Sequence, residues 1–249
     1  MARLRRPQPG LSENLDLLTP LEPMAASPSG VDGHRGRLRA RLLTAGPEAL
    51  ADHEMLEIVL FALPRRDTKP LARTLLDRFG SFAAAIAAPV PELLSVEGLG
   101  ETGAAALKTV QAAALRLQRA GVMNRPVLAS WDQLIGYLNA ALALEKVEQV
   151  RVLFLDSRNR LLADEGQGRG TVNHTPVYPR EVVKRALELH AGALILVHNH
   201  PSGDPAPSRE DIAMTRDIAA AARVMQITVH DHIIIAAGRW FSFRQEGLM

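Results

Sequence analysis

The chain of 249 residues contains no cysteine. This absence excludes disulfide bonds, cysteine-ligated zinc sites and catalysis by a thiol. It also removes the Cys-x-x-Cys half of the metal site that a zinc nucleobase deaminase requires. The composition therefore argues against the deaminases as a class before any motif is considered.

Long apolar runs are missing as well. No segment approaches the ~18 uninterrupted apolar residues that a membrane span requires, and the N-terminus shows no apolar signal core. We therefore expect a cytoplasmic protein without a membrane partner. With 47% hydrophobic residues, the chain can bury a substantial core and is long enough for two domains.

The first 33 residues differ from the rest in composition. They contain five prolines, three glycines and little periodicity, with Arg3, Arg5 and Arg6 at the start. Such a segment cannot bury enough apolar surface to fold alone. We expect residues 1–33 to form a disordered basic tail.

Residues 34–120 carry a helical pattern of apolar positions. The predicted helices cover residues 35–43, 51–63, 71–79 and 104–119. These segments predict a small all-α domain. Residues 121–126 interrupt the pattern, so residues 121–129 are expected to form a linker to a second domain at 130–249.

The second domain alternates helices and strands. A helix is expected over residues 131–144 and another after Pro179. Apolar runs predict strands at 148–156, 193–197 and 226–235, and residues 156–160 are expected to turn the first of these into a hairpin with 161–165. The pattern indicates an α/β domain.

The most informative motif is His198-Asn-His200, which follows directly on the predicted strand 193–197. Residues two apart in a strand project from the same face of the sheet. The two imidazoles are therefore expected to converge.

A carboxylate follows at a fixed distance. Residues 201–207 contain three prolines and must form a loop, and Ser208 then begins a helix whose first turn carries Asp211. His198, His200 and Asp211 make three protein ligands and leave the fourth tetrahedral position open, as in catalytic zinc sites.

A simpler interpretation exists for each of these residues. Ser208 and Asp211 also fit a helix N-cap with an acidic residue at the third position, and two histidines at a strand end can simply hydrogen-bond a loop. The joint spacing, in its strand, loop and helix context, favours the metal site.

The spacing H-x-H-x7-S-x2-D resembles the signature of the JAB/MPN (JAMM) metalloprotease fold, and HNHPSGDPAPSREDIAMTR is similar to its RadC branch. The similarity covers about residues 34–249 and includes Pro179-Arg-Glu181, Asp231-His-Ile233 and Phe241-Ser-Phe243. It implies a mixed β-sheet flanked by helices, with deaminase-like layering, preceded by a small all-α domain.

The resemblance also implies a chemistry. It assigns Zn²⁺ to the two histidines and Asp211, with a metal-activated water that cleaves a peptide or isopeptide bond of a protein or peptide substrate. An upstream glutamate acts as general acid and base. Glu148 fits this role best, and Glu181 is the alternative, although an acidic residue in a first helical turn also suits the helix dipole. Ser208 is similar to an oxyanion-stabilising hydroxyl.

Residues 93–104 resemble a helix-hairpin-helix motif, in which Gly98 and Gly100 would let the backbone approach a DNA phosphate. Glu97 and Glu101 flank the hairpin, and Thr102 stands where DNA-binding examples often have a basic residue. A tight helix connection without a ligand is therefore equally open. The alternative function is a DNA-binding accessory protein in repair or recombination, with a metal domain that is structural or acts on nucleic acid. The sequence leaves the oligomeric state open.

A second His-x-His pair, His230 and His232, lies on a late predicted strand but lacks a spaced carboxylate. We expect His232 to pack or hydrogen-bond behind the first site and orient a ligand there. The remaining histidines are expected at the surface or in packing roles; they are His34, His53, His174 and His190.

Overall fold

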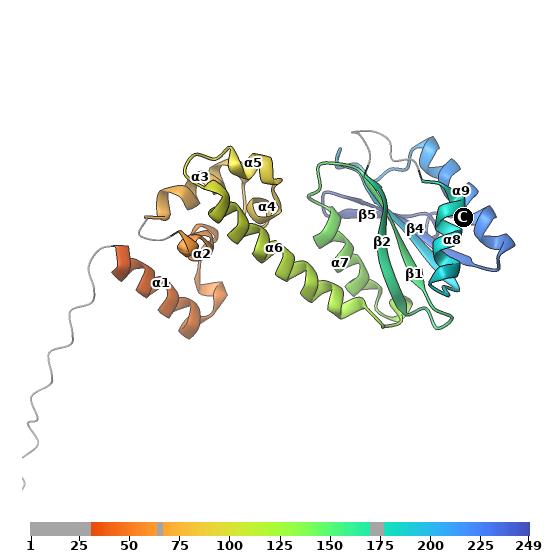
Figure 1. The fold of residues 1–249 in the computed structure, drawn as a ribbon, viewed down its shortest axis with the longest axis horizontal. Helices are drawn as coiled ribbons and strands as arrows, with labels where there is room; N and C mark the ends of the chain where they lie inside the picture. The colour runs from red at the N-terminus through yellow and green to blue at the C-terminus, as the bar shows by residue number, and fades with distance from the viewer. Residues whose placement is uncertain (1–30, 64–66, 170–176) are drawn as a thin grey trace, which may run out of the picture.

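The computed structural model describes residues 31–63, 67–169 and 177–249, so the predicted tail up to residue 30 and His174 lie outside it. Figure 1 shows a group of helices, residues 31–122, beside a sheet covered by helices, residues 123–249. We call these the helical unit and the α/β unit. The long helix α6 (Gly100–Val122) reaches from one to the other.

Further helices of the helical unit surround the first half of α6. They are α1 (Val31–Ala45), α2 (Asp52–Val59), α3 (Lys69–Phe79), α4 (Phe82–Ala87) and α5 (Val90–Leu94). Apolar side chains of α2 to α6 make one core, which includes the fully buried Leu56, Leu75, Leu93 and Leu107. Burial of this set supplies the main driving force for the fold of this unit.

The sequence did not predict α4 and α5. They have only six and five residues, too few for an apolar period to show. Local signals do mark their boundaries: Gly80 closes α3 in the left-handed region with φ 86°, and the Ser81 hydroxyl accepts a hydrogen bond from the amide of Ala84.

The segment predicted as a linker, residues 121–129, is packed instead. α6 continues to Val122, and Val122 and Val127 are buried in the core of the α/β unit. The Val127 amide donates a hydrogen bond to the carbonyl of Asn159. The apolar side chains explain the difference, because a free linker would expose them to water.

No helix in the described ranges is both long and apolar enough to cross a membrane.

The α/β unit contains a five-stranded sheet in the order β2-β1-β3-β4-β5. The strands are β1 (Gln149–Leu155), β2 (Leu161–Arg169), β3 (Ala193–Asn199), β4 (Thr228–Ala236) and β5 (Arg239–Ser242). β3 and β4 are parallel, and the other neighbours are antiparallel. The predicted α/β class with a mixed sheet flanked by helices is confirmed.

Helices cover both faces of the sheet (Figure 1). Ile195 and Val197 of β3 pack with α7 (Trp131–Leu142) on one face. Leu194 and Leu196 pack with α8 (Pro179–Glu188) and α9 (Arg209–Val224) on the other. β3 is the central strand of the sheet. Its side chains alternate between the two faces, and this alternation determines the face on which each residue at its carboxyl end lies.

Candidate metal centre

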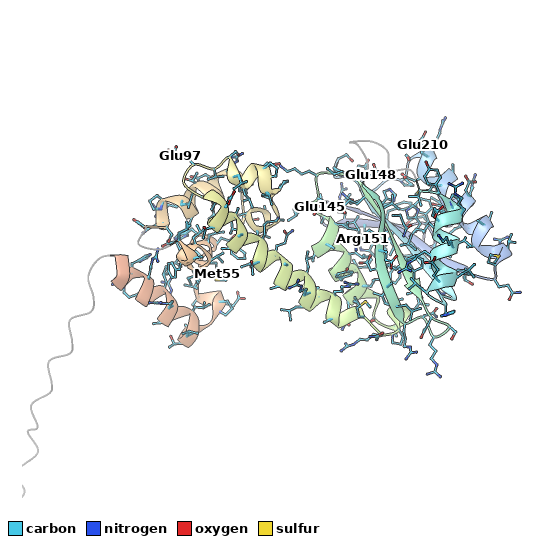
Figure 2. The ribbon with its side chains drawn as sticks, in the orientation of Figure 1. Met55, Glu97, Glu145, Glu148, Arg151 and Glu210 are labelled. Carbon is cyan, nitrogen blue, oxygen red and sulfur yellow. The ribbon has the colours of Figure 1, made fainter. Side chains whose placement is uncertain are left out.

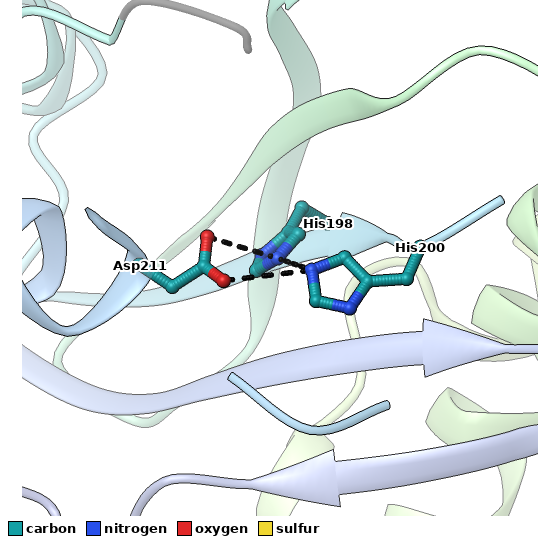
Figure 3. A group of neighbouring side chains, drawn as sticks. All are labelled: His198, His200 and Asp211. Carbon is teal, nitrogen blue, oxygen red and sulfur yellow. Dashed lines mark hydrogen bonds and ion pairs between the residues drawn. The ribbon is translucent and has the colours of Figure 1, made fainter. Parts of the chain in front are cut away.

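The structure brings the three predicted ligands together (Figure 3). The Nε2 atoms of His198 and His200 lie 2.8 Å apart. His198 Nε2 lies 3.2 Å from Asp211 Oδ1, and His200 Nε2 lies 3.5 Å from Asp211 Oδ2. All three side chains thus direct one donor atom toward a common point, and the group could hold a metal ion.

The carboxyl end of β3 positions the two histidines. His198 lies on the α8/α9 face with Leu194 and Leu196, and His200, just past the end of the strand, turns to the same side. The His198 side chain is fully buried, whereas that of His200 is 16% exposed. The centre is therefore anchored in the core at His198 and reaches solvent at His200.

The start of α9 positions the carboxylate. The Ser208 hydroxyl accepts a hydrogen bond from the Asp211 amide at 3.0 Å, and Asp211 Oδ2 accepts bonds from the Ser208 amide and hydroxyl at 2.8 and 2.7 Å. This is a reciprocal helix cap. The cap and the metal interpretation therefore describe one geometry, in which the cap occupies Oδ2 and Oδ1 faces His198.

Electrostatics keep this carboxylate ionised. Burial opposes its charge, but hydrogen bonds with the two histidines and Ser208 hold the pKa of Asp211 well below its usual range. The hydrogen bond to Asp211 raises the pKa of His200 despite partial burial, and the negative charge of Glu148 adds to this rise. The site therefore attracts positive charge, as a cation site should.

The tautomer of His200 is fixed by its second nitrogen. Its Nδ1 lies 2.8 Å from the carbonyl oxygen of Asp204. A carbonyl only accepts, so Nδ1 carries the proton, and in the neutral ring the lone pair of Nε2 faces the centre.

A buried chain of hydrogen bonds fixes His198 in the same way. The Thr215 hydroxyl donates to the carbonyl of Asp211 at 2.6 Å, so it must accept from His232 Nδ1, also at 2.6 Å. His232 Nε2 then accepts from His198 Nδ1 at 2.7 Å. Burial holds the pKa of His232 well below its usual range, which keeps the ring neutral as this chain requires. The lone pair of His198 Nε2 is left for a metal.

The expected role of His232 is confirmed, since it lies behind the ligands, fully buried and stacked 4.5 Å from Phe243. His230 instead bonds Asn159 Oδ1 at 2.7 Å. Within the described ranges the second His-x-His pair forms no further group able to hold a metal.

The two candidate glutamates occupy different surroundings. Glu148 immediately precedes β1, whose pairing with β3 starts at Val150 opposite His198, and it is half-buried (Figure 2). Its charge acts on His200. Glu181 lies in the first turn of α8, where its side chain is 53% exposed and its carboxylate pairs with Arg180 Nε at 3.2 Å.

Sequence reasoning missed Asn199, the residue between the two histidines. Its side chain is buried and faces away from them, and it hydrogen-bonds the main chain on both sides of Glu148. An amide at a core-facing strand position was the available signal, because buried polar groups need partners.

The glycines of the predicted hairpin lie far along the chain from this centre: Gly98 lies between α5 and α6, and Gly100 is the first residue of α6. Gly98 and Gly100 have φ of 83° and 61°, and a Cβ on Gly100 would meet nothing within 4 Å. Gly103 makes a close approach, since a Cβ there would lie 2.5 Å from Leu99 Cδ1. The glycines therefore explain the turn and its packing, and they leave its outer side accessible.

Comparison with known proteins gives a consistent result. Residues 128–248 match the family profile described as RadC-like JAB domain. The chain is 60% identical over 213 residues to a UPF0758 protein of Rhodobacter capsulatus, covering 85% of this chain and all of the relative. It is 54% identical over 223 residues to a UPF0758 protein of Ruegeria pomeroyi, covering 89% of this chain and all of that relative. The matched domain contains the three candidate ligands, Ser208 and Glu148.

Proposed function

Because the chain belongs to the RadC family and carries a RadC-like JAB domain, we propose that it is a zinc-dependent hydrolase of peptide or isopeptide bonds. One observation carries this proposal: the three donor atoms of His198, His200 and Asp211 converge, with both histidine tautomers set for metal binding. A helix cap or a loop contact alone would not require both Nε2 lone pairs to face one point.

The donor set fits the metal. Two imidazole nitrogens and one carboxylate oxygen match a three-ligand catalytic zinc site, which leaves one position for water or substrate. The exposed side of His200 provides access to that position. When bound, Zn²⁺ supplies a Lewis acid that polarises a carbonyl group and brings the pKa of coordinated water near neutrality.

Glu148 is proposed as the general acid and base. It takes a proton from the attacking water as the water oxygen bonds the carbonyl carbon, and it delivers a proton to the amine nitrogen as the C–N bond breaks. Its position directly before β1, the strand that pairs with His198, and its charge effect on His200 support this role. Glu181 is engaged with Arg180 and more exposed, which supports Glu148 over it.

Ser208 is proposed to have two roles. Its amide and hydroxyl hold Asp211 Oδ2, so it positions a ligand. During the reaction its hydroxyl would turn its one proton from Asp211 Oδ2 to the negative charge that develops on the carbonyl oxygen, a contribution of about 2.7 to 4 kcal/mol for such a donor elsewhere, while its amide keeps the bond to Oδ2.

The test compares Glu148→Gln with Glu181→Gln. Zinc per chain is measured by elemental analysis, and amine release is measured with a panel of peptides and lysine-linked isopeptides. Glu148→Gln should keep about one zinc and lose activity by a factor of about 10² to 10⁴, whereas Glu181→Gln should keep both. Full activity in the metal-free protein would refute the proposal, and the opposite result for the two variants would move the base to Glu181.

A further inference from the structure

We propose that Asn199 is the positioning residue that holds Glu148 at the metal centre. The proposal rests on the role of Glu148 proposed above. Asn199 hydrogen-bonds none of the donor atoms of the candidate ligands. It acts on Glu148 through the main chain of residues 145–149.

The alternation of β3 gives Asn199 its direction. His198 lies on the α8/α9 face, so Asn199, the next residue and the last of the strand, projects toward the α7 face. The loop between α7 and β1, residues 143–148, reaches that face at the end of the strand. The residue between two ligands therefore contacts the segment that carries the proposed base.

Three hydrogen bonds make this contact. Asn199 Oδ1 accepts from the Gln149 amide at 2.9 Å, and Asn199 Nδ2 donates to the carbonyls of Glu145 and Val147 at 3.3 and 3.2 Å. Both amide protons are used, and all three partners are main-chain atoms within three residues of Glu148. The backbone on either side of the carboxylate is thus tied to β3.

The ladder between β1 and β3 does not reach this far, because it starts at Val150 opposite His198. On its other side, Gln149 already pairs with Arg169 of β2. On the β3 side, the Asn199 side chain takes the place that main-chain groups occupy within the ladder. This amide, which is 1% exposed and so shielded from competing water, therefore ties the segment that carries Glu148 to the strand that carries the two histidines.

The ligands have separate supports. His198 is held by His232, His200 by the carbonyl of Asp204, and Asp211 by Ser208. None of these bonds involves the Asn199 side chain. Loss of the amide should therefore separate the base from the metal centre while the centre stays intact.

The test uses Asn199→Ala and Asn199→Asp, with Asn139→Ala on α7 as the matched control. Asn199→Asp keeps the side-chain shape and the acceptor for Gln149 but places an oxygen opposite the carbonyls of Glu145 and Val147, so it removes only those two bonds. Circular dichroism establishes that each variant is folded before the measurements. Three quantities are measured on the full chain: zinc per chain, hydrogen exchange of the amides of residues 145–149, and kcat and KM on any substrate that the isopeptide panel identifies.

We expect both Asn199 variants to bind one zinc with wild-type affinity. In Asn199→Ala, exchange of the Gln149 amide should rise by about tenfold or more, since the buried hydrogen bond that protects it is lost. In Asn199→Asp this amide keeps its acceptor, and exchange of the other loop amides should rise because the loop opens more often once the two carbonyl bonds are lost. The kcat should fall on the order of 10- to 100-fold, with a smaller change in KM, because the base is displaced while substrate binding sites remain. Asn139→Ala should change none of the three.

Two results would overturn the positioning role. Zinc loss in step with activity would show that Asn199 supports the ligand strand, and unchanged loop exchange would show that the three bonds do not hold the loop. Failure of the underlying function is recognised separately: if Glu148→Gln hydrolyses like the wild type, Glu148 is not the base, whatever Asn199 does to loop exchange. The exchange measurement needs no substrate.

Discussion

The two units of this protein bury different kinds of side chain. Among the described residues, the buried polar groups of the helical unit are Glu57 and Thr68, whereas the α/β unit buries Asp164, His198, Asn199, Asp211, Thr215, Asp231, His232 and Ser242. Buried polar groups cost free energy unless each finds a partner. The α/β unit therefore depends on a network of polar partners, and the candidate metal centre lies in it, whereas the helical unit is held mainly by apolar contacts.

The largest effect that separates the units concerns metal. His198→Ala should abolish zinc binding, because it removes a ligand and leaves His232 without its partner. The stabilisation that zinc gives the wild type, about 4 kcal/mol at a concentration 1,000 times its Kd, should disappear with it. The measurement is the thermal midpoint with zinc and with chelator, and His53→Ala in the helical unit serves as control. A zinc effect that survives in His198→Ala would place the metal elsewhere.

A core substitution in the helical unit should lower stability and leave zinc binding unchanged. Leu107→Ala removes a fully buried side chain and should lower the free energy of unfolding by about 2 to 5 kcal/mol. Zinc per chain should not change. Urea denaturation measures the first quantity, and Leu117→Ala, on the same helix but 76% exposed, should be close to neutral. If zinc content falls with Leu107, the two units are not independent.

The hydrogen-bond chain behind His198 sharpens the comparison within the α/β unit. Thr215→Val removes the hydroxyl that accepts from His232 and donates to Asp211, and should weaken zinc binding by about 10- to 100-fold. Competition with a chelator of known affinity measures this loss. Thr215→Ser keeps the hydroxyl and should restore most of the affinity, whereas equal losses in both variants would point to packing of the methyl group.

DNA binding would give the helical unit a function of its own. Glu97 and Glu101 flank the accessible hairpin, so we expect affinity for duplex DNA no better than the non-specific range of about 10⁻⁴ to 10⁻⁶ M. Fluorescence anisotropy over a range of salt concentrations measures it. Tighter binding that falls steeply with salt, and is lost when Gly98 and Gly100 are replaced by bulky residues, would make this unit a functional one.

The smallest effect is expected where the units meet. Lys146 lies two residues before Glu148, and its Nζ lies 2.6 Å from Oε1 of Glu92 on α5. The side chains of Lys146 and Glu92 are 60% and 34% exposed. Exposed pairs contribute about 0 to 1 kcal/mol, so Lys146→Ala should change kcat less than about threefold. A double-mutant cycle with Glu92→Ala measures the coupling. A large coupling would mean that the helical unit controls the loop of the proposed base.

Local rules predicted that the three candidate ligands converge, as they do in the structure. The strand period of two predicted that His198 and His200 project to the same side, and the three-residue spacing of a helix cap predicted the position of Asp211. Both rules act within a few residues, so the sequence alone was sufficient. The mixed order of the sheet needed the resemblance to a known family, because strand pairing joins segments far apart in the chain.

The rest required the fold. Asn199 contacts Glu145, Val147 and Gln149, about 50 residues earlier, and no periodicity predicts such a pairing. Glu148 and Glu181 each fit a local pattern, and only their surroundings in three dimensions distinguish them. The packing of segment 121–129 was missed because Gly121 and Pro126 are typical of a linker. The sequence does not show which surface lies beside this segment in the fold.

Asp211 takes part in the centre twice, through its carboxylate and through its own main-chain carbonyl. From the carbonyl the bonds run to Thr215, His232 and His198. His198 Nε2 lies 3.2 Å from Asp211 Oδ1 across the candidate metal position, so a bound ion would close a ring. The members of such a ring constrain one another, so the effects of two substitutions within it should not add. We therefore expect Asp211, Thr215, His232 and His198 to respond to substitution as one coupled group.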